Sequence, residues 1–364
     1  MNEQQVDNLI MAGGTGGHIF PGLAVARALQ AQGENVAWLG SQKSMEAERV
    51  PKAGIQFYGL SISGIRGKGR LKLLVAPLKL LRALWQAWVL LRRLKPKRVL
   101  GFGGFASGPG GLAAVLLGIP VYIHEQNALP GMTNKRLAPF ARQVFTAFPG
   151  AFPASERVVC VGNPVREDLL KLAPPEVRYQ QRSGPLQVLV IGGSLGAQAL
   201  NQALPLAVAL LPANQRPKIV HQAGSGKLEA CLRSYKQALG EVPPEVEVTD
   251  FIEDMGSALG WADLVLCRAG ALTVAEVAAA GVASVLVPYP YAVDDHQTHN
   301  ARFLADREAG ILLAQTELAA ERLASLISGQ SLDRGQLAIM ASRAKSLAKP
   351  QATATIIEHL LKDK

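Results

Sequence analysis

The chain has little of several features that mark common classes of protein. Its 364 residues include three cysteines, Cys160, Cys231 and Cys267, which lie far apart and form no CxxC pair. An odd number of cysteines, scattered along the sequence, indicates buried thiols in a reducing compartment. Aromatic residues make up only 5% and no nucleic-acid-binding signature is present, so we expect no nucleic acid partner. The polar residues 1–5 do not resemble a signal peptide.

Acidic residues are missing from a long stretch of the first half. None lies between Glu48 and Glu125. Residues 1–165 carry 19 Lys and Arg against 7 Asp and Glu, a net of +12, whereas the remainder carries 19 against 21, a net of −2. The basic excess therefore belongs to the first half, and we expect a partner with a negative surface to meet that half.

A dedicated metal site is also missing. No Asp-x-Asp pair occurs, and the Asp294-Asp295-His296 cluster is of a kind that more often caps a helix or faces solvent. We therefore expect no cofactor and no metal site of the protein's own. A Mg²⁺ ion held loosely on a diphosphate ligand stays open.

What the chain does have is glycine at three sharp turns. They span residues 13–18, 101–111 and 192–197, and each follows an apolar run and leads into a helical stretch. Glycine lets backbone amides approach a ligand closely, and a helix N-terminus that starts at such a turn favours an anion. These turns predict a phosphate or sugar-phosphate ligand.

Apolar runs alternate with helical stretches through both halves. The expected strands are residues 8–11, 36–39, 99–101, 120–124, 144–148, 158–161, 187–191, 218–222, 246–249, 264–267 and 284–288. A helix is expected over 21–29, with Pro21 in its first turn. This alternation predicts an α/β fold of two Rossmann-like, doubly wound parallel sheets that face a cleft, with ligands beyond the carboxyl ends of the strands.

The expected organisation has four parts. Residues 1–164 form an N-terminal domain and the proline-containing stretch 165–185 forms a linker. Residues 186–345 form a C-terminal domain, and 346–364 form a C-terminal helix that packs back on the N-terminal domain.

A basic, leucine-rich segment, Leu71–Leu94, follows a glycine- and arginine-rich stretch over 64–70. Its apolar residues recur at helical spacing, but Pro77, Lys79 and Arg82 interrupt it too often for a spanning helix. Two compatible interpretations stay open, a helix that covers a sheet and an amphipathic helix on an anionic membrane. The expected stripe is Leu74, Leu78, Leu81, Trp85 and Trp88, and the expected membrane contacts are Leu74, Leu78, Leu81, Trp85, Lys72, Lys79 and Arg82.

Several strings resemble one bacterial family in the same order along the chain. They are MAGGTGGHIFPGLAVA, GIRGKG, GFGGFASGPGG, HEQNALPGMTNK, VGNPVR, GGSLGAQALN and RAGALTVAE. They resemble the MurG family, which adds N-acetylglucosamine to lipid I in peptidoglycan synthesis. The chain departs from the family pattern mildly, at Ala269 and Ala275.

The resemblance implies a two-domain glycosyltransferase of the GT-B type. It would transfer N-acetylglucosamine, with inversion, from UDP-N-acetylglucosamine (UDP-GlcNAc) to the 4-hydroxyl of N-acetylmuramyl-pentapeptide on undecaprenyl diphosphate, so that lipid I becomes lipid II. It also implies a peripheral place on the cytoplasmic face of the bacterial inner membrane, an anionic membrane surface and cell-wall synthesis enzymes as partners, and roles in cell shape and division. The alternatives are a UDP-GlcNAc 2-epimerase, another GT-B glycosyltransferase, a nicotinamide-dependent oxidoreductase and a membrane-surface scaffold.

The resemblance also implies the site. His18 is the candidate base that takes the acceptor's proton, and Glu125 is a second candidate. The implied substrate-binding residues are Thr15, Gly16, Gly17, Asn127, Arg166, Ser194, Ile252, Ala271, Leu272, Thr273, Val274, Ala275, Glu276 and Gln297.

Glu276 has two competing interpretations. Thr273 and Glu276 fit a helix capping box, in which the glutamate bonds to the cap amide. The family resemblance favours a carboxylate that binds the ribose hydroxyls of UDP. Arg166 likewise has an alternative role as a salt-bridge residue in the linker.

Overall fold

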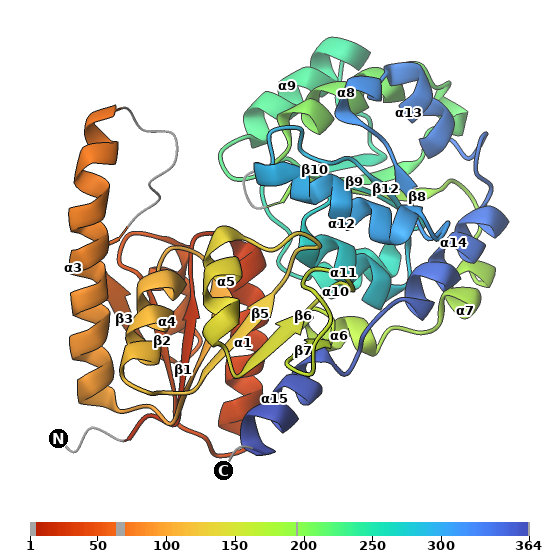
Figure 1. Ribbon diagram of the computed structural model, residues 1–364. Coiled ribbons are helices and arrows are strands. Elements are labelled where there is room, and N and C mark those ends of the chain that lie inside the picture. The colour runs from red at the N-terminus through yellow and green to blue at the C-terminus, as the bar shows by residue number, and fades with distance from the viewer. Residues whose placement is uncertain (1–4, 63–69, 194–195, 363–364) are drawn as a thin grey trace. The chain divides into compact units, whose positions relative to one another are not determined.

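The computed structural model describes residues 5–62, 70–193 and 196–362, and for 70–76 it describes the backbone alone. The chain forms two compact units (Figure 1). Unit 1 comprises Met1–Val165 and Lys349–Lys364, and unit 2 comprises Arg166–Ala348. Each unit is built on one parallel sheet, which confirms the expected α/β class with two doubly wound sheets.

The sheet of unit 1 has the strand order β3-β2-β1-β4-β5-β6-β7. Its strands are β1 (Asn8–Ala12), β2 (Val36–Ser41), β3 (Gln56–Leu60), β4 (Arg98–Gly103), β5 (Val121–Glu125), β6 (Gln143–Thr146) and β7 (Val158–Cys160). β1, β2, β4 and β5 are buried along their whole length. Apolar runs without alternation are typical of parallel strands covered on both faces.

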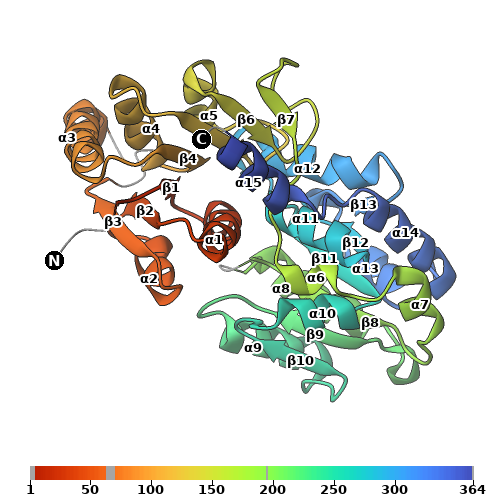
Figure 2. The same cartoon turned by 90° about the horizontal axis from the view of Figure 1, so that it is seen from below.

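Helices cover both faces of this sheet (Figure 2). They are α1 (Gly16–Ala31), α2 (Met45–Lys52), α3 (Arg70–Leu94), α4 (Ser107–Leu116), α5 (Met132–Leu137), the short η1 (Ala138–Phe140) and α15 (Ala352–Lys362). α1 and α15 pack together on one face, and α3 and α4 pack together on the other. The buried Arg98 ties α15 to the sheet, since its guanidinium donates to Leu360 O and pairs with Glu34.

One expectation for unit 1 is wrong in detail, and one strand was missed. α1 begins at Gly16, so Pro21 lies inside the helix and not in its first turn. The glycine turn itself starts the helix, because Thr15 takes the extended backbone of an N-cap residue. β3 was not expected, because its residues alternate weakly and are only partly buried.

The sheet of unit 2 has the strand order β10-β9-β8-β11-β12-β13. Its strands are β8 (Gln187–Ile191), β9 (Lys218–Gln222), β10 (Val246–Thr249), β11 (Leu264–Cys267), β12 (Ala283–Leu286) and β13 (Ile311–Leu312). The bounds of β8 to β11 are those expected from the sequence. The two-residue β13 was missed.

The helices of unit 2 also lie on both faces of its sheet (Figure 1). They are α6 (Glu167–Leu170), α7 (Pro175–Gln180), α8 (Gln198–Ala209), α9 (Leu228–Leu239), α10 (Met255–Trp261), α11 (Ala271–Ala280), α12 (His296–Ala305), α13 (Ala320–Ile327) and α14 (Arg334–Ser346), with short helices η2 (Ala213–Gln215), η3 (Val293–Asp295) and η4 (Gln315–Glu317). α8, α9 and α13 pack on one face, and α10, α11 and α12 group on the other.

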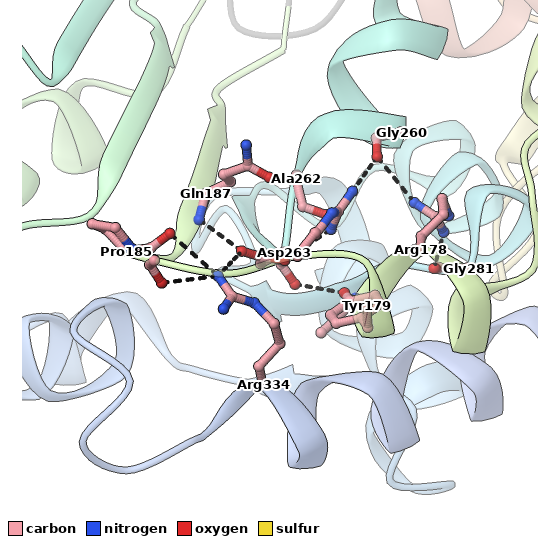
Figure 3. A network of polar contacts seen from close by, with 12 residues as sticks. Arg178, Tyr179, Pro185, Gln187, Gly260, Ala262, Asp263, Gly281 and Arg334 are labelled. Carbon is pink, nitrogen blue, oxygen red and sulfur yellow. Dashed lines mark hydrogen bonds and ion pairs between the residues drawn. The ribbon is translucent and has the colours of Figure 1, made fainter.

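The stretch 165–185, expected as a linker, is largely folded onto unit 2. Arg178 in α7 is buried, and its guanidinium donates to Ala280 O at 2.6 Å and to Gly281 O. The fully buried Asp263 pairs with Arg182 at 2.8 Å and with Arg334 at 3.0 Å (Figure 3). This polar network binds α7 and α14 to the sheet of the unit.

Candidate functional site

Three loops begin side by side at the carboxyl edge of the sheet in unit 1. Met11 in β1 pairs with Gly101 in β4, and Gly101 pairs with Ile123 in β5. The strand order reverses between β1 and β4, so this edge contains the switch point at which α/β sheets bind ligands. The loops that leave β1, β4 and β5 carry the first two glycine turns and the HEQN sequence.

The two glycine turns of unit 1 touch through their backbones. Gly104 has a φ of +86°, and a Cβ there would lie 2.1 Å from Gly13 O. The buried hydroxyl of Ser107 donates toward Met11 O and Gly103 O, at 2.7 and 2.6 Å, and so ties β1 to the second turn. Only glycine permits this approach at position 104.

His18 lies on α1, against the second glycine turn. A Cβ on Gly103 would lie 3.3 Å from the Cε1 and Nδ1 atoms of His18. The same Nδ1 lies 2.9 Å from Gln126 Oε1, a residue 108 positions away in the sequence. The fold therefore brings the candidate base to the HEQN loop.

Glu125 is the last residue of β5, directly before that loop, and its carboxylate is buried and bonded to residues that follow the strand. Oε1 accepts from the Asn127 amide at 3.0 Å, and Oε2 accepts from the Gly131 amide at 3.0 Å and from Asn134 Nδ2 at 2.9 Å. The residue is 1% exposed. These contacts favour a role in shaping the loop over a role as the proton acceptor.

A second buried carboxylate supports the first glycine turn. Glu46, in α2, is fully buried and accepts from the Ser41 amide at 2.9 Å and the Gly14 amide at 3.3 Å. A Cβ on Gly13 would lie 2.4 Å from Glu46 Oε1. The contacts of Glu46 thus fix the conformation of the turn. The amides of Gly16 and Gly17, in the first turn of α1, then remain for a ligand.

Unit 2 repeats this arrangement at its own switch point, between β8 and β11. Ile191 pairs with Cys267, so the loops that follow these two strands begin next to each other. A Cβ on Gly192 would lie 2.2 Å from the Ala197 amide nitrogen, and one on Gly196 would lie 1.9 Å from Ala223 O. The third glycine turn therefore also requires glycine, and it leads into α8. The expected contact Ser194 lies outside the described residues.

Glu276 and Arg166 meet in unit 2. Arg166 Nε lies 3.2 Å from Glu276 Oε1, and their side chains are 35% and 12% exposed. α11 begins at Ala271 and its N-cap residue is Gly270, without a side-chain cap, so the capping box of Thr273 and Glu276 does not form. The carboxylate is therefore not used to close the helix end.

Glu276 has an unusual protonation equilibrium. Burial raises the pKa of its carboxyl from 4.5 to about 7, although Arg166 opposes the rise, and Asp168 adds to it. A buried acid with a raised pKa and one cationic partner is a pattern that marks functional sites.

The remaining expected residues of unit 2 lie on neighbouring loops and helix ends. Ile252 follows β10 and is half-buried. Gln297, in the first turn of α12, accepts from the Tyr289 amide at 2.9 Å. Asp294 and Asp295 just before it have φ values of +53° and +51°, a strained backbone that non-glycine residues rarely adopt. The other expected contacts lie in the first turns of α11, namely Ala271, Leu272, Thr273, Val274 and Ala275.

The sequence interpretation missed three residues of unit 1. Gln126, His124 and Glu46 are buried and make polar contacts at or beneath the glycine turns. Gln126 and His124 lie in the quoted HEQN string, so the signal for them was present. Across the ranges that the structure describes, no cluster of three or more His, Cys, Asp or Glu residues could hold a metal ion.

Two doubly wound sheets, each with a glycine turn and a helix N-terminus at its switch point, are typical of the two-domain class of glycosyltransferases. The chain matches the glycosyltransferase family 28 N-terminal domain over residues 9–146 and the family 28 C-terminal domain over residues 187–356. It belongs to the MurG family within these glycosyltransferases, as the following relatives show.

Two relatives carry the name UDP-N-acetylglucosamine–N-acetylmuramyl-(pentapeptide) pyrophosphoryl-undecaprenol N-acetylglucosamine transferase. The protein of Burkholderia orbicola is 51% identical over 353 residues, which cover 97% of this chain and 95% of the relative. That of Burkholderia thailandensis is 52% identical over 345 residues, which cover 95% and 93%.

Solved structures agree with this assignment. The crystal structure of Acinetobacter baumannii MurG has a TM-score of 0.82 and 43% identity, with 98% of this chain and 99% of that chain covered. A UDP-GlcNAc 2-epimerase from Neisseria meningitidis shares the fold at a TM-score of 0.67, with 15% identity and with 98% and 100% of the two chains covered.

Replacement of Gly104 by alanine tests the contact between the two turns of unit 1. We expect Gly104→Ala to lower the free energy of unfolding by about 2 kcal/mol more than Gly118→Ala. Both glycines have positive φ, but a Cβ at Gly118 has no atom within 4 Å, whereas one at Gly104 meets Gly13 O. Chemical denaturation of both variants measures the difference. Equal losses would contradict a tight backbone contact.

Glu276→Gln tests the buried acid through the pH dependence of stability. The pKa of Glu276 is raised in the folded state, so its contribution is fully present below pH 4.5 and is lost as the pH rises through about 7. We expect wild type and variant to be equally stable near pH 4, and the variant to be more stable by about 3 kcal/mol above pH 7.

Substitution of Arg166, the ion-pair partner of Glu276, gives a second test of the raised pKa. Arg166→Met removes the cation that lowers the pKa of Glu276, so the loss of stability, which still begins near pH 4.5, should extend to a higher pH and grow larger. Denaturation curves from pH 4 to pH 9 measure both effects. A stability difference between wild type and Glu276→Gln that does not vary with pH would refute the raised pKa.

Proposed function

We propose that the chain transfers N-acetylglucosamine from UDP-GlcNAc to the 4-hydroxyl of the muramyl sugar of lipid I, with inversion, to give lipid II. The observation that carries this function is the pair of switch points, one with a histidine in unit 1 and one with a buried acid in unit 2. The activity for which relatives that are half identical over nearly the whole chain are named supplies the substrates.

Unit 2 would bind the donor. Glu276 would accept hydrogen bonds from the ribose hydroxyls, in exchange for part of its contact with Arg166. The turn at Gly192 and Gly193 and the N-terminus of α8 would hold the diphosphate, together with Ser194. Amides that point at the leaving UDP stabilise the charge that develops on it. Ile252 would contact uracil, and Gln297 the sugar hydroxyls.

Unit 1 would bind the acceptor. Thr15, Gly16 and Gly17 present the first turn of α1, where N–H groups and the helix dipole favour a diphosphate. The hydroxyl proton of the acceptor passes to the His18 imidazole as its oxygen attacks the anomeric carbon. The bond from that carbon to UDP breaks, and its electron pair leaves with the diphosphate. One displacement of an α-linked donor gives a β-linked product without a covalent enzyme intermediate.

The epimerase alternative shares the fold but has less support. Its solved representative is only 15% identical, so the likeness extends to the fold alone. An epimerase also has no use for an acceptor site, whereas unit 1 carries the basic excess of the sequence.

Acceptor-dependent release of UDP tests this function. With a short-chain lipid I analogue, we expect wild type to release UDP and form the lipid-linked disaccharide. His18→Ala should lower kcat by about 10²- to 10⁴-fold, which is the usual contribution of a general base, with little change in KM for UDP-GlcNAc. His359→Ala, in α15 of the same unit, is the matched control and should keep its activity. Release of UDP without acceptor, or free 2-epimerised sugar, would establish the epimerase instead.

We further propose that α3 and α4 rest on an anionic membrane surface on the cytoplasmic side. Leu78, Leu81 and Trp85 lie on one stripe of α3 and are 67%, 61% and 64% exposed. Leu116 on the adjoining α4 is 65% exposed. Lys79 and Arg82, which are also exposed, flank the stripe and would meet acidic headgroups.

The other side of α3 packs on the sheet of unit 1. Ala83, Ala87 and Leu91 are fully buried, and Trp88 is half-buried against the same core, with Arg92 over its ring at 4.7 Å. Trp88 therefore lies outside the exposed stripe. The side chains of Lys72 and Leu74, and residues 63–69, lie outside the described part of the chain. No helix in the described ranges is both long and apolar enough to span a bilayer.

Two exposed leucines give a matched test of the membrane surface. Leu81 in unit 1 is 61% exposed and Leu206 in unit 2 is 55% exposed. We expect Leu81→Ser to weaken binding to phosphatidylglycerol-containing vesicles by about tenfold, since burial of a leucine side chain is worth roughly 1.5–3 kcal/mol. Leu206→Ser should bind as wild type does. Vesicle sedimentation measures both, and an equal loss in the two variants would contradict this assignment.

A further inference from the structure

A chain of hydrogen bonds leads from His18 into the core of unit 1. His18 Nδ1 lies 2.9 Å from Gln126 Oε1, and Gln126 Nε2 lies 3.2 Å from both Nδ1 and the carbonyl oxygen of His124. His124 Nε2 lies 2.9 Å from Gly162 O. His124 and Gln126 are 0% and 1% exposed, and the proposed reaction assigns neither of them a role.

The contact between His124 and Gly162 determines which ring nitrogen of His124 carries a proton. The Gly162 carbonyl oxygen can only accept a hydrogen bond, so His124 carries a proton on Nε2. Burial lowers the pKa of His124 to about 4, so near neutral pH the ring holds this one proton. Its Nδ1 is then an acceptor.

The orientation of Gln126 follows from that of His124. Two acceptors of His124, Nδ1 and the carbonyl oxygen, face the Gln126 side chain, so its NH₂ group must point toward them. The amide oxygen then faces His18 and can only accept. His18 must therefore donate from Nδ1, which leaves the lone pair on Nε2 when the ring holds one proton.

We propose that Gln126, itself oriented by His124, is a positioning residue that keeps His18 in the Nδ1–H tautomer with Nε2 as its basic nitrogen. The inference rests on the proposed role of His18 as the base. Gln126 accepts from Nδ1–H whether or not Nε2 carries a proton. His18 can therefore take up a proton on Nε2 while every hydrogen bond from Gln126 to Gly162 stays as it is. Gly103, which has no side chain, leaves room for the ring.

The tautomer can be observed directly by NMR. The full-length protein with ¹⁵N-labelled histidine has six histidines, and spectra of His18→Ala and His124→Gln identify the two of interest. In long-range ¹H–¹⁵N spectra of the wild type above neutral pH, we expect His18 to be protonated on Nδ1 and His124 on Nε2.

Substitution of Gln126 connects the tautomer to the reaction. Gln126→Met removes the acceptor, so His18 should shift toward the Nε2–H tautomer that a free imidazole side chain prefers. We expect kcat to fall by about 5- to 50-fold, with the KM for UDP-GlcNAc unchanged. Gln126→Glu retains an acceptor for Nδ1–H but loses the donor to His124, so it should keep the His18 tautomer and recover only part of the lost kcat. Gln143→Met, at the amino end of the neighbouring strand β6 and thus at the opposite edge of the sheet from Gln126, is the control.

Different results would contradict the positioning role of Gln126 and the role of His18 as the base. An Nε2–H tautomer of His18 in the wild type, or the same tautomer in wild type and Gln126→Met, would overturn the inference and leave the transferase intact. Full kcat in His18→Ala together with an Nδ1–H tautomer in the wild type would overturn the base and leave the positioning by Gln126 supported.

Discussion

The functional edge of unit 1 depends on direct contact between two backbone turns. Gly104, at a positive φ, lies against Gly13, and the Ser107 hydroxyl ties the strand before one turn to the other turn. Protein interiors are close-packed, so a contact of this kind has little room to adjust. The position of His18 follows from it, because its ring lies on Gly103 and its Nδ1 reaches Gln126. The position of the candidate base therefore depends on this contact between the two turns, together with the side chains of Ser107 and Gln126.

The two units use the same architecture for different chemistry. In both, glycine lets a strand turn sharply into a helix at the point where the strand order reverses. In unit 1 the carboxylates near that point, Glu46 and Glu125, bond to backbone amides of the loops, the histidine lies beside them, and the sequence around them is strongly basic. In unit 2 a buried carboxylate, Glu276, lies on the helix that follows the switch point. Amides and an imidazole suit an anionic acceptor and proton removal, whereas a carboxylate suits the hydroxyls of a ribose.

The sequence predicted the fold well wherever a strand was a continuous apolar run. β8 and β11 are such runs and have the predicted bounds, and the mixed strands β9 and β10 also do, since a glycine, proline or charged residue lies within two residues of each strand end. Prediction failed where local and tertiary signals disagree. Pro21 suggested a helix start, but the glycine turn before it begins the helix. The proline-containing stretch 165–185 packs on unit 2 through contacts of Arg178 with Ala280 and of Arg182 with Asp263, which are distant in sequence. The role of Gln126 could not be predicted, because it depends on a contact across 108 residues.

Glu125 and Glu276 show why a residue type alone does not identify a role. Both are buried glutamates within family strings, and both were candidates from the sequence. Glu125 makes its contacts inside its own loop, through backbone and side-chain N–H groups of residues 127–134. Glu276 has a single cationic partner, the half-exposed Arg166, and its carboxyl has a pKa raised to about 7. A carboxylate whose hydrogen bonds are already satisfied stabilises the structure around it, whereas one held by a single, displaceable partner can exchange that partner for a substrate hydroxyl. On this argument we propose Glu276 as the acid that meets substrate, and Glu125 as the residue that shapes the loop in which Gln126 lies beside His18.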